Sequence, residues 1–161
     1  MPGTRERSSD VTPTARMPTR SRPVVLGTLS VRPDPTAEQM AIDSCLEAAV
    51  PLIIANVVFI PPYPQTMVLA GVNAAVLPHE EDLYAVRETA NRAAALGIPV
   101  RHLRVATRHQ VTALLEVVTE NDAGLLVFGP DLTRIGARRF RRAARRLRRD
   151  AGCLVWIAPD G

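Results

Sequence analysis

Five short apolar runs alternate along the chain with longer segments in which apolar residues recur at helical spacing. The runs cover residues 23–29, 51–60, 98–105, 123–130 and 153–159. Most of them are continuously apolar, as expected of strands buried on both faces of a sheet. The intervening segments predict helices over residues 34–50, 79–97, 109–122 and 134–149. This strict alternation predicts an α/β fold with one parallel sheet and helices on both of its faces.

Local signals mark where two helices begin and where one ends. Thr36 with Gln39, and Thr107 with Gln110, have the spacing of a capping box. Gly97 suits the position just after the last residue of the second predicted helix, where a left-handed conformation is common. We therefore expect the first and third helices to begin with reciprocal side-chain caps.

The first 22 residues differ in composition from the rest of the chain. Residues 1–22 are rich in Ser, Thr, Pro and Arg without hydrophobic periodicity, which predicts a disordered basic tail. The folded domain is expected over residues 23–159. Within it, residues 66–78 are apolar and uncharged, and their pattern fits either a short helix or a covering loop.

The formal net charge of +4 hides a strong segregation of charge. The chain contains no lysine, so all 20 basic residues are arginine. Residues 1–22 carry +3 and residues 134–149 carry +9, whereas the remainder carries −8. The body of the domain is therefore acidic, while one helix and one tail are basic. Hydrophobic residues make up 47% of the chain and aromatic residues only 4%, which indicates an aliphatic core.

The sequence shows neither a membrane span nor a disulfide framework. It has no apolar run of about 18 residues, and the first 22 residues lack the apolar stretch of a secretory signal. We therefore expect a cytoplasmic protein without membrane contact. Cys45 and Cys153 lie far apart without metal-ligand spacing, and both are expected to be buried as small hydrophobic residues.

The polar residues form no catalytic or metal-binding constellation in the sequence. The three histidines, His79, His102 and His109, lack metal-ligand spacing, and only His109 lies near the expected ligand edge of the sheet. Asp131 follows an apolar strand as a phosphoacceptor would, but such sites need further acids and a lysine. Ser30 has no neighbouring base. We therefore expect no catalytic residue, no bound metal and no enzymatic activity.

The segments PVVLGTL, LIIANVVFIPP, AAALGIPV, LLVFGPD and CLVWIAP together resemble the universal stress protein domain over about residues 23–159. The resemblance implies a five-stranded parallel sheet of order 3-2-1-4-5, Rossmann-like and similar to the adenine nucleotide alpha hydrolases. It also implies a homodimer that pairs the last strands, formed here by Cys153, Leu154, Val155, Trp156 and Ile157. Trp156 is then expected to cover part of the dimer surface.

Many members of this family bind ATP through the motif G-x2-G-x9-G-[ST] after the fourth strand. Glycines there let backbone amides approach the phosphates at the start of a helix. Gly129 matches the first glycine, but the second position is Leu132. The last position falls on Arg141 or Arg142, depending on the register, and Gly136 is a displaced glycine.

Thr28 and Val57 would be the other positions of the family's nucleotide site. Thr28 stands where family members usually carry an acidic residue that contacts the nucleotide sugar. Because bulky side chains also replace both later glycines, we expect ordinary ATP binding to be lost and no cofactor to be bound. The alternative is ATP binding through a phosphate loop rebuilt around arginine.

The arginine-rich helix has one apolar stripe for packing on the sheet, made of Gly136, Phe140, Ala143, Ala144, Leu147 and Ala151. Three interpretations of its arginines stay open: a solvated helix, a contact with an acidic protein, and a contact with nucleic acid or another polyanion. The aromatic residues that would stack on bases are absent. The sequence favours a regulatory or stress-response module without ordinary ATP binding. The alternatives are an ATP-binding protein and a polyanion-binding or nucleic-acid-binding adaptor.

Overall fold

The computed structural model describes residues 21–60 and 80–158 of the chain. Most of the predicted tail, residues 66–78 and His79 lie outside these ranges. The strands are β1 (Val24–Leu29), β2 (Leu52–Phe59), β3 (Val100–Thr107), β4 (Leu125–Phe128) and β5 (Leu154–Ile157). The helices are α1 (Pro35–Ala48), α3 (Glu80–Ala95), α4 (Gln110–Glu120) and α5 (Ala137–Asp150). None of the helices within the described ranges is long and apolar enough to cross a membrane.

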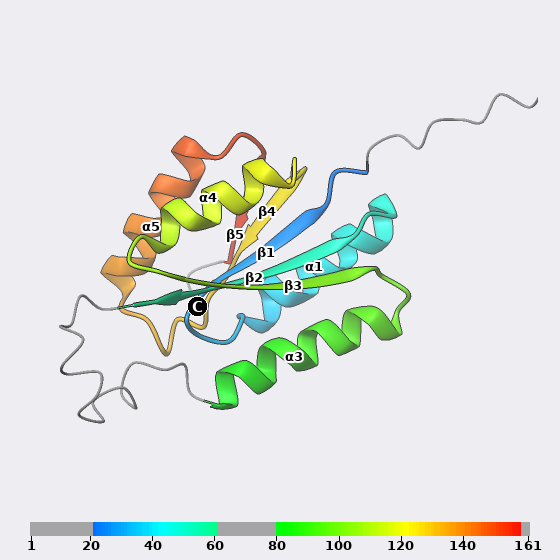
Figure 1. The fold of residues 1–161 in the computed structure, drawn as a ribbon, viewed down its shortest axis with the longest axis horizontal. Helices are drawn as coiled ribbons and strands as arrows, with labels where there is room; N and C mark the ends of the chain where they lie inside the picture. Colours follow the sequence, from blue (N-terminus) through cyan, green and yellow to red (C-terminus); the bar gives the residue numbers. More distant parts are fainter. Residues whose placement is uncertain (1–20, 61–79, 159–161) are drawn as a thin grey trace, which may run out of the picture.

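All five strands run parallel in one sheet of order β3-β2-β1-β4-β5, which confirms the predicted fold class. Helices α1 and α3 cover one face of the sheet, and α4 and α5 cover the other (Figure 1). The order of winding reverses between β1 and β4, which are neighbours in the sheet. In open parallel sheets such a switch point places a crevice beyond the carboxyl ends of the strands.

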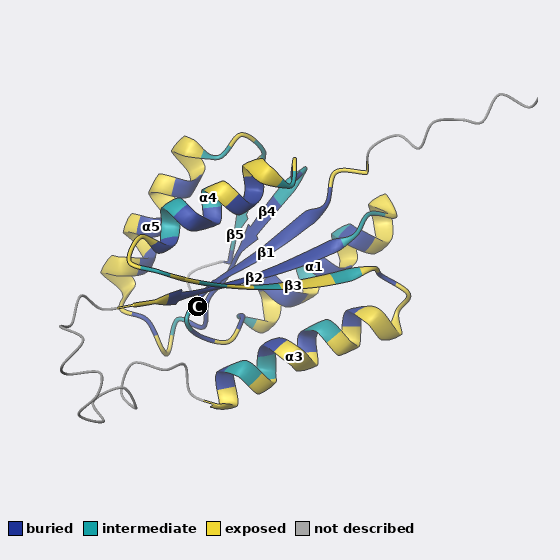
Figure 2. Ribbon diagram, viewed as in Figure 1, coloured by how far each residue is buried: buried dark blue, intermediate teal, exposed yellow. Residues whose placement is uncertain are grey.

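Two apolar layers hold the helices against the sheet, and the outer faces of α3 and α5 are largely exposed (Figure 2). Beneath α4 and α5, Leu147 is fully buried and the rings of Phe128 and Phe140 stack with their centroids 5.7 Å apart. Burying one side chain of this size stabilises the fold by about 2 kcal/mol. Beneath α1 the layer contains small residues such as Ala37 and Ala41, which let this helix approach the strands closely.

The structure corrects both predicted capping boxes. Helix α1 is capped by Asp34, whose carboxylate accepts a hydrogen bond from the Thr36 N–H at 2.8 Å. Helix α4 has no side-chain cap, because Thr107 Oγ1 accepts from the His109 N–H instead of a helical amide. Gln110 turns inward, where its amide group donates to Ser30 Oγ and to a backbone carbonyl of β2. The hydrogen-bond partners of these polar residues therefore differ from those that sequence spacing alone predicts.

Three residues test the expectations for one helix end and for the burial of the two cysteines. Gly97 follows α3 with a φ of +82°, which confirms the predicted left-handed helix end. Cys45 is buried as expected, and burial raises the pKa of its thiol to about 11. Cys153 is only half-buried, so the expectation of burial is wrong for this residue, which precedes an edge strand.

Gly129 is a packing residue where the first turn of α1 meets the end of β4. A β-carbon at this position would lie 2.1 Å from the Ala37 β-carbon and 3.2 Å from the Ala158 β-carbon. The first distance is far inside van der Waals contact. The position of α1 therefore requires glycine here, whatever the site binds.

Replacing Gly129 by alanine is expected to destabilise the fold by about 2 kcal/mol, because overpacking a rigid contact typically costs about 1–3 kcal/mol. Urea unfolding followed by circular dichroism measures the change. The double variant Gly129→Ala with Ala37→Gly removes the clashing methyl group and should recover part of the loss. Gly152→Ala is the matched control, since a β-carbon there meets no atom within 4 Å. Equal stability of Gly129→Ala and this control would contradict the packing role.

Candidate functional site

Two loops meet where the sheet topology places a crevice. The loop after β1 (residues 30–34) and the loop after β4 (residues 129–136) leave neighbouring strands at the same edge of the sheet. An isolated antiparallel bridge joins them at Pro33 and Pro130. We call this joining of the two loops, with the side chains that support it, the loop closure.

Backbone hydrogen bonds hold the loop closure at both ends of the bridge. The Asp34 N–H donates to the Gly129 carbonyl at 2.8 Å. The Asp131 N–H donates to the Arg32 carbonyl at 3.0 Å. The two loops therefore pair with one another as short strands would, across the switch point between β1 and β4.

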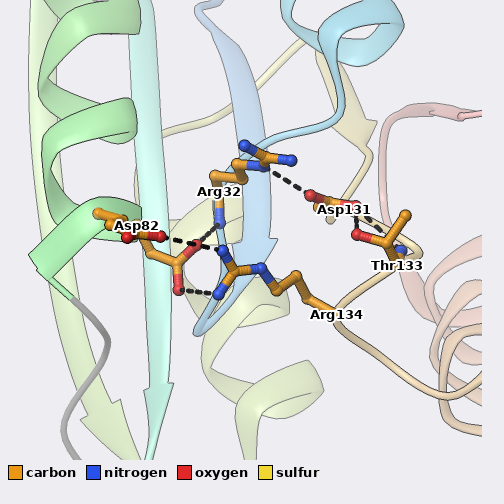
Figure 3. A network of polar contacts seen from close by, with 6 residues as sticks. Arg32, Asp82, Asp131, Thr133 and Arg134 are labelled. Carbon is orange, nitrogen blue, oxygen red and sulfur yellow. Dashed lines mark hydrogen bonds and ion pairs between the residues drawn. The ribbon is translucent and has the colours of Figure 1, made fainter.

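A buried carboxylate reinforces this pairing (Figure 3). Arg32 Nε donates to Asp131 Oδ2 at 2.6 Å. The other oxygen of Asp131 accepts from the N–H and the hydroxyl of Thr133 at 2.9 and 2.7 Å. Asp131 is only 7% exposed, and a carboxylate with so little access to water needs donors of this kind. Asp131 is thus a structural residue that joins the loops.

Helix α3 supplies acids to the same cluster. Asp82 is 2% exposed, and its Oδ1 accepts from the Arg32 N–H at 3.2 Å. Its other oxygen lies 3.7 Å from one terminal guanidinium nitrogen of Arg134 (Figure 3). The other terminal nitrogen of Arg134 lies 3.3 Å from a carboxylate oxygen of Glu81. Both arginines of the loop closure, Arg32 and Arg134, therefore already face carboxylates.

The balance of forces on Asp131 keeps it ionised. Burial by itself would raise the pKa of this carboxyl, but hydrogen bonds from Thr133 and Arg32, together with the charge of Arg32, outweigh it. The pKa of Asp131 consequently lies below its usual value. The ionised form is the one that holds the loops together.

Thr28 and Val57, two predicted positions of the nucleotide site, are fully buried. Thr28 Oγ1 donates to Asn56 Oδ1 at 3.2 Å across the β1–β2 pair. Val57 packs in the apolar layer beneath α4 and α5. Strand pairing brings both residues towards the same sheet edge as Gly129, but neither side chain is exposed there. Asn56 Nδ2 has no hydrogen-bond partner among the described residues.

The loop after β4 is half as long as the motif G-x2-G-x9-G requires. Gly136 is the N-cap of α5, so six residues separate it from Gly129. Gly136 therefore lies at the start of the helix. A β-carbon at Gly136 would meet no atom within 4 Å, whereas Leu132 packs against the core.

Arg141 and Arg142 lie on the exposed face of α5, beyond the loop. The two positions that the motif predicts for its last glycine therefore lie within the helix, after its N-cap Gly136. These arginines stand beside the crevice on a helix and do not form its phosphate turn.

Solved structures of universal stress proteins share this architecture. A universal stress protein in complex with cAMP is 26% identical, covers 87% of this chain and 98% of its own, and has a TM-score of 0.59. This likeness supports the assignment to the universal stress protein family. No protein-family model matches the sequence, and no curated protein matches it at a significant level.

Two further structures share the fold of this protein. A member of the family from Burkholderia pseudomallei is 19% identical, covers 88% of this chain and 98% of its own, and has a TM-score of 0.58. The universal stress protein from Archaeoglobus fulgidus in complex with dAMP is 18% identical, covers 84% and 96%, and has a TM-score of 0.52.

Sequence reasoning missed the loop closure. Arg32 and Asp131 each stand three residues after the end of a strand. The predicted strand order makes those two strands neighbours, so opposite charges shortly after both strands were the available signal. The contributions of Asp82 and Arg134 depend on how α3 packs, which no local pattern reveals.

Protonating Asp131 is expected to weaken the loop closure. Because its folded-state pKa is depressed, its contribution to stability is complete above about pH 5 and is lost as the pH falls through the folded-state pKa. The free energy of unfolding should therefore fall less steeply from about pH 5 to pH 3 in Asp131→Asn than in the wild type. Urea unfolding at a series of pH values measures these slopes.

Glu47→Gln is the control for this pH series, because Glu47 is exposed and forms no ion pair among the described residues. It also removes one carboxylate, and it should keep the wild-type slope. Parallel profiles for Asp131→Asn and the wild type would show that this carboxylate does not support the fold.

Proposed function

We propose that this universal stress protein is a non-enzymatic regulatory module of the stress response that holds no nucleotide in the crevice between β1 and β4. The observation that carries the proposal is the loop closure, in which the backbone of one loop is bonded to the backbone of the other. Phosphates bind at such a turn through free backbone N–H groups. Here four of the seven N–H groups of residues 129–136 donate within the protein, those of Gly129, Asp131, Thr133 and Arg134.

The loop after β4 has few free backbone donors. The Gly129 N–H donates to the Gly27 carbonyl at 3.4 Å, and Pro130 has no N–H group. The Asp131 N–H is used in the loop closure, and the Arg134 N–H donates to the Asp131 carbonyl at 3.0 Å. A phosphate in this turn would have to displace these bonds, and each displaced bond costs about 0.5–1.5 kcal/mol.

The alternative is a nucleotide site rebuilt around arginine, since two of the compared proteins hold cAMP and dAMP. Such a site would need guanidinium groups free to meet phosphates. Arg134 lies within 4 Å of Glu81 and Asp82, and Arg32 is bonded to Asp131. The geometry of the crevice therefore favours the module without nucleotide.

Titration with Mg·ATP, AMP and cAMP, followed by the amide signals of the isotopically labelled protein, tests the proposal. The amides of residues 129–136 are expected to stay unshifted at millimolar nucleotide, because most of their donors are engaged within the protein. Saturable shifts confined to these amides would overturn the proposal. Shifts elsewhere would report a different site and leave the crevice unoccupied.

We further propose that the module is a homodimer formed through β5. The two edges of the sheet differ in character, because β3 exposes Arg101, His102 and Arg104, whereas β5 exposes Leu154 to 75% and holds Trp156 half-exposed. Charged edge strands resist pairing, and apolar ones favour it. Within the described residues β5 pairs only with β4. A second copy of β5 would cover this free edge, as the family resemblance implies.

Leu154→Arg is expected to raise the dissociation constant of the dimer by at least about tenfold, because it buries an unpaired charge in each half of the interface. Sedimentation over a range of protein concentrations measures this constant. Leu96→Arg is the matched control, since Leu96 is 52% exposed and lies after α3, away from β5. A dimer unaffected by Leu154→Arg, or a wild type that is monomeric throughout, would rule out this interface.

The outer face of α5 supports a second candidate function, the binding of an acidic protein or a polyanion. Six of its arginines form no salt bridge among the described residues: Arg138, Arg139, Arg141, Arg142, Arg145 and Arg148. Many of the acids lie across the sheet on α1 and α3. The positive charge of α5 is therefore not neutralised locally and is available to a partner.

A further inference from the structure

A groove of about 510 Å³ lies between α5 and the end of β5. We call it the basic groove, because three arginines of α5 line it: Arg141, Arg145 and Arg148. Arg139 and Arg146, on the other side of this helix, donate hydrogen bonds to residues of α4. The basic groove therefore lies on the side of α5 away from α4, and none of the loop-closure residues lines it.

The arginines of the basic groove carry charge that no described neighbour neutralises. Their spacings of four and three residues place them along one side of α5, in a row about 10 Å long. None of the three forms a salt bridge with a described residue, and no described lining residue is acidic. By contrast, Arg146 and Arg149 of the same helix pair with Asp150. The row therefore attracts acidic groups from outside the fold.

The floor of the basic groove is apolar. Phe140 and Ala158 lie there, each only 3% exposed, and Ala144 is also buried. Ile157 is half-buried, so part of its side chain stays accessible beside the arginines. It packs against the apolar layer beneath α4 and α5, which fixes its position. The basic groove thus presents an apolar contact and a row of positive charge side by side.

This lining favours a peptide over a nucleic acid. Single-stranded nucleic acids bind by stacking their bases on aromatic rings. The aromatic residue that lines the groove, Phe140, is buried and already stacks on Phe128, with 5.7 Å between the ring centroids. An inorganic polyanion or the backbone of a duplex would meet the arginines but leave Ile157 uncovered. A polypeptide can supply carboxylates and an apolar side chain together, so it can contact both the arginines and the floor.

We propose that the basic groove binds a short acidic segment of another protein. Carboxylates of this segment pair with Arg145 and Arg148, and one of its apolar side chains contacts Ile157. Side chains two residues apart in an extended chain lie about 7 Å apart, close to the roughly 6 Å along a helix axis between residues four positions apart. This inference rests on the second candidate function, the binding of an acidic partner by α5, and assigns it to one side of the helix.

The basic groove and the proposed dimer contact use different residues of β5. Side chains alternate between the two faces of a sheet along each strand. Ile157 packs with the layer beneath α4 and α5, whereas Trp156 packs with the layer beneath α1. Leu154, two residues before Trp156, belongs to the same face as Trp156. The acidic segment and the dimer can therefore be tested separately.

The probe is a synthetic peptide in which a central leucine is flanked on both sides by glutamate and aspartate, with both ends blocked. Fluorescence anisotropy of the labelled peptide with the full-length protein, in physiological salt, measures the dissociation constant. The double variant Arg145→Gln with Arg148→Gln should raise this constant at least about tenfold, because it removes two charged hydrogen-bond donors.

The matched control is the double variant Arg138→Gln with Arg142→Gln. These two arginines are exposed on the same helix, form no salt bridge with a described residue and do not line the basic groove. The control removes the same total charge, and it should raise the dissociation constant by less than about threefold, since salt screens distant charges. Circular dichroism of each variant verifies that these exposed substitutions leave the fold intact.

A second peptide tests the apolar floor. Replacing the central leucine of the peptide by serine keeps its charge and should weaken binding at least about threefold, because the contact with Ile157 is lost. Saturable shifts of the amide signals of residues 144–148 and 155–158 in the isotopically labelled protein would locate the peptide in the basic groove.

Equal weakening by the two double variants would overturn the inference but leave α5 as a diffuse surface for acidic partners, so the second candidate function would survive. Equal binding of the leucine and serine peptides would also overturn the inference, because charge alone would then explain the binding. Binding of heparin without binding of the peptide at millimolar concentration would overturn it in favour of a polyanion. Absence of binding for both the peptide and heparin would remove the second candidate function as well.

Discussion

A carboxylate that is almost removed from water must be surrounded by donors, and in this protein that requirement joins two loops of neighbouring strands. Asp131 lies after β4, and most of its hydrogen-bond donors come from its own loop, but the charged one comes from Arg32 after β1. Moving the loops apart would leave a buried charge without its partner, which is far more costly than losing an exposed salt bridge. The backbone bonds between the loops add to the same constraint. The conformation of the crevice follows from this one contact.

Gly129 illustrates how one residue type can serve two physical purposes. In a phosphate turn, glycine lets backbone amides approach the anion. At Gly129, the missing side chain instead makes room for Ala37 of α1, since a β-carbon would come within 2.1 Å of that alanine. A match to the first position of a nucleotide motif therefore says nothing about binding until the neighbours of the glycine are known.

The sequence predicted the strands, the helices and the strand order, because each depends on patterns that local residues carry or on the family resemblance. The apolar run at residues 51–60 and the terminating Gly97 are examples, and both correspond to observed elements. The partners of polar side chains were predicted less well. Gln110 was assigned to a capping box and is bonded instead to Ser30, far away in the sequence. Such partners depend on how helices pack across the sheet.

The candidate site was predicted least well, because its location depends on the length of one loop. Counting along the family motif placed Arg141 and Arg142 at the phosphate turn, whereas the helix has already begun at that point. A glycine-rich turn recognises anions through backbone donors, whereas arginine recognises them through its side chain.

With only six residues between Gly129 and Gly136, and with most backbone donors of that stretch engaged internally, a phosphate has little main chain to meet. Arginine side chains do not require the backbone to lie close to a phosphate, because they are long and extend outward from α5. One side of α5 lies beside the start of α4, whose N-cap His109 makes no side-chain hydrogen bond to the helix. The loop after β4 thus offers a phosphate few free backbone donors, whereas the arginines of α5 are exposed side chains on the same side of the sheet.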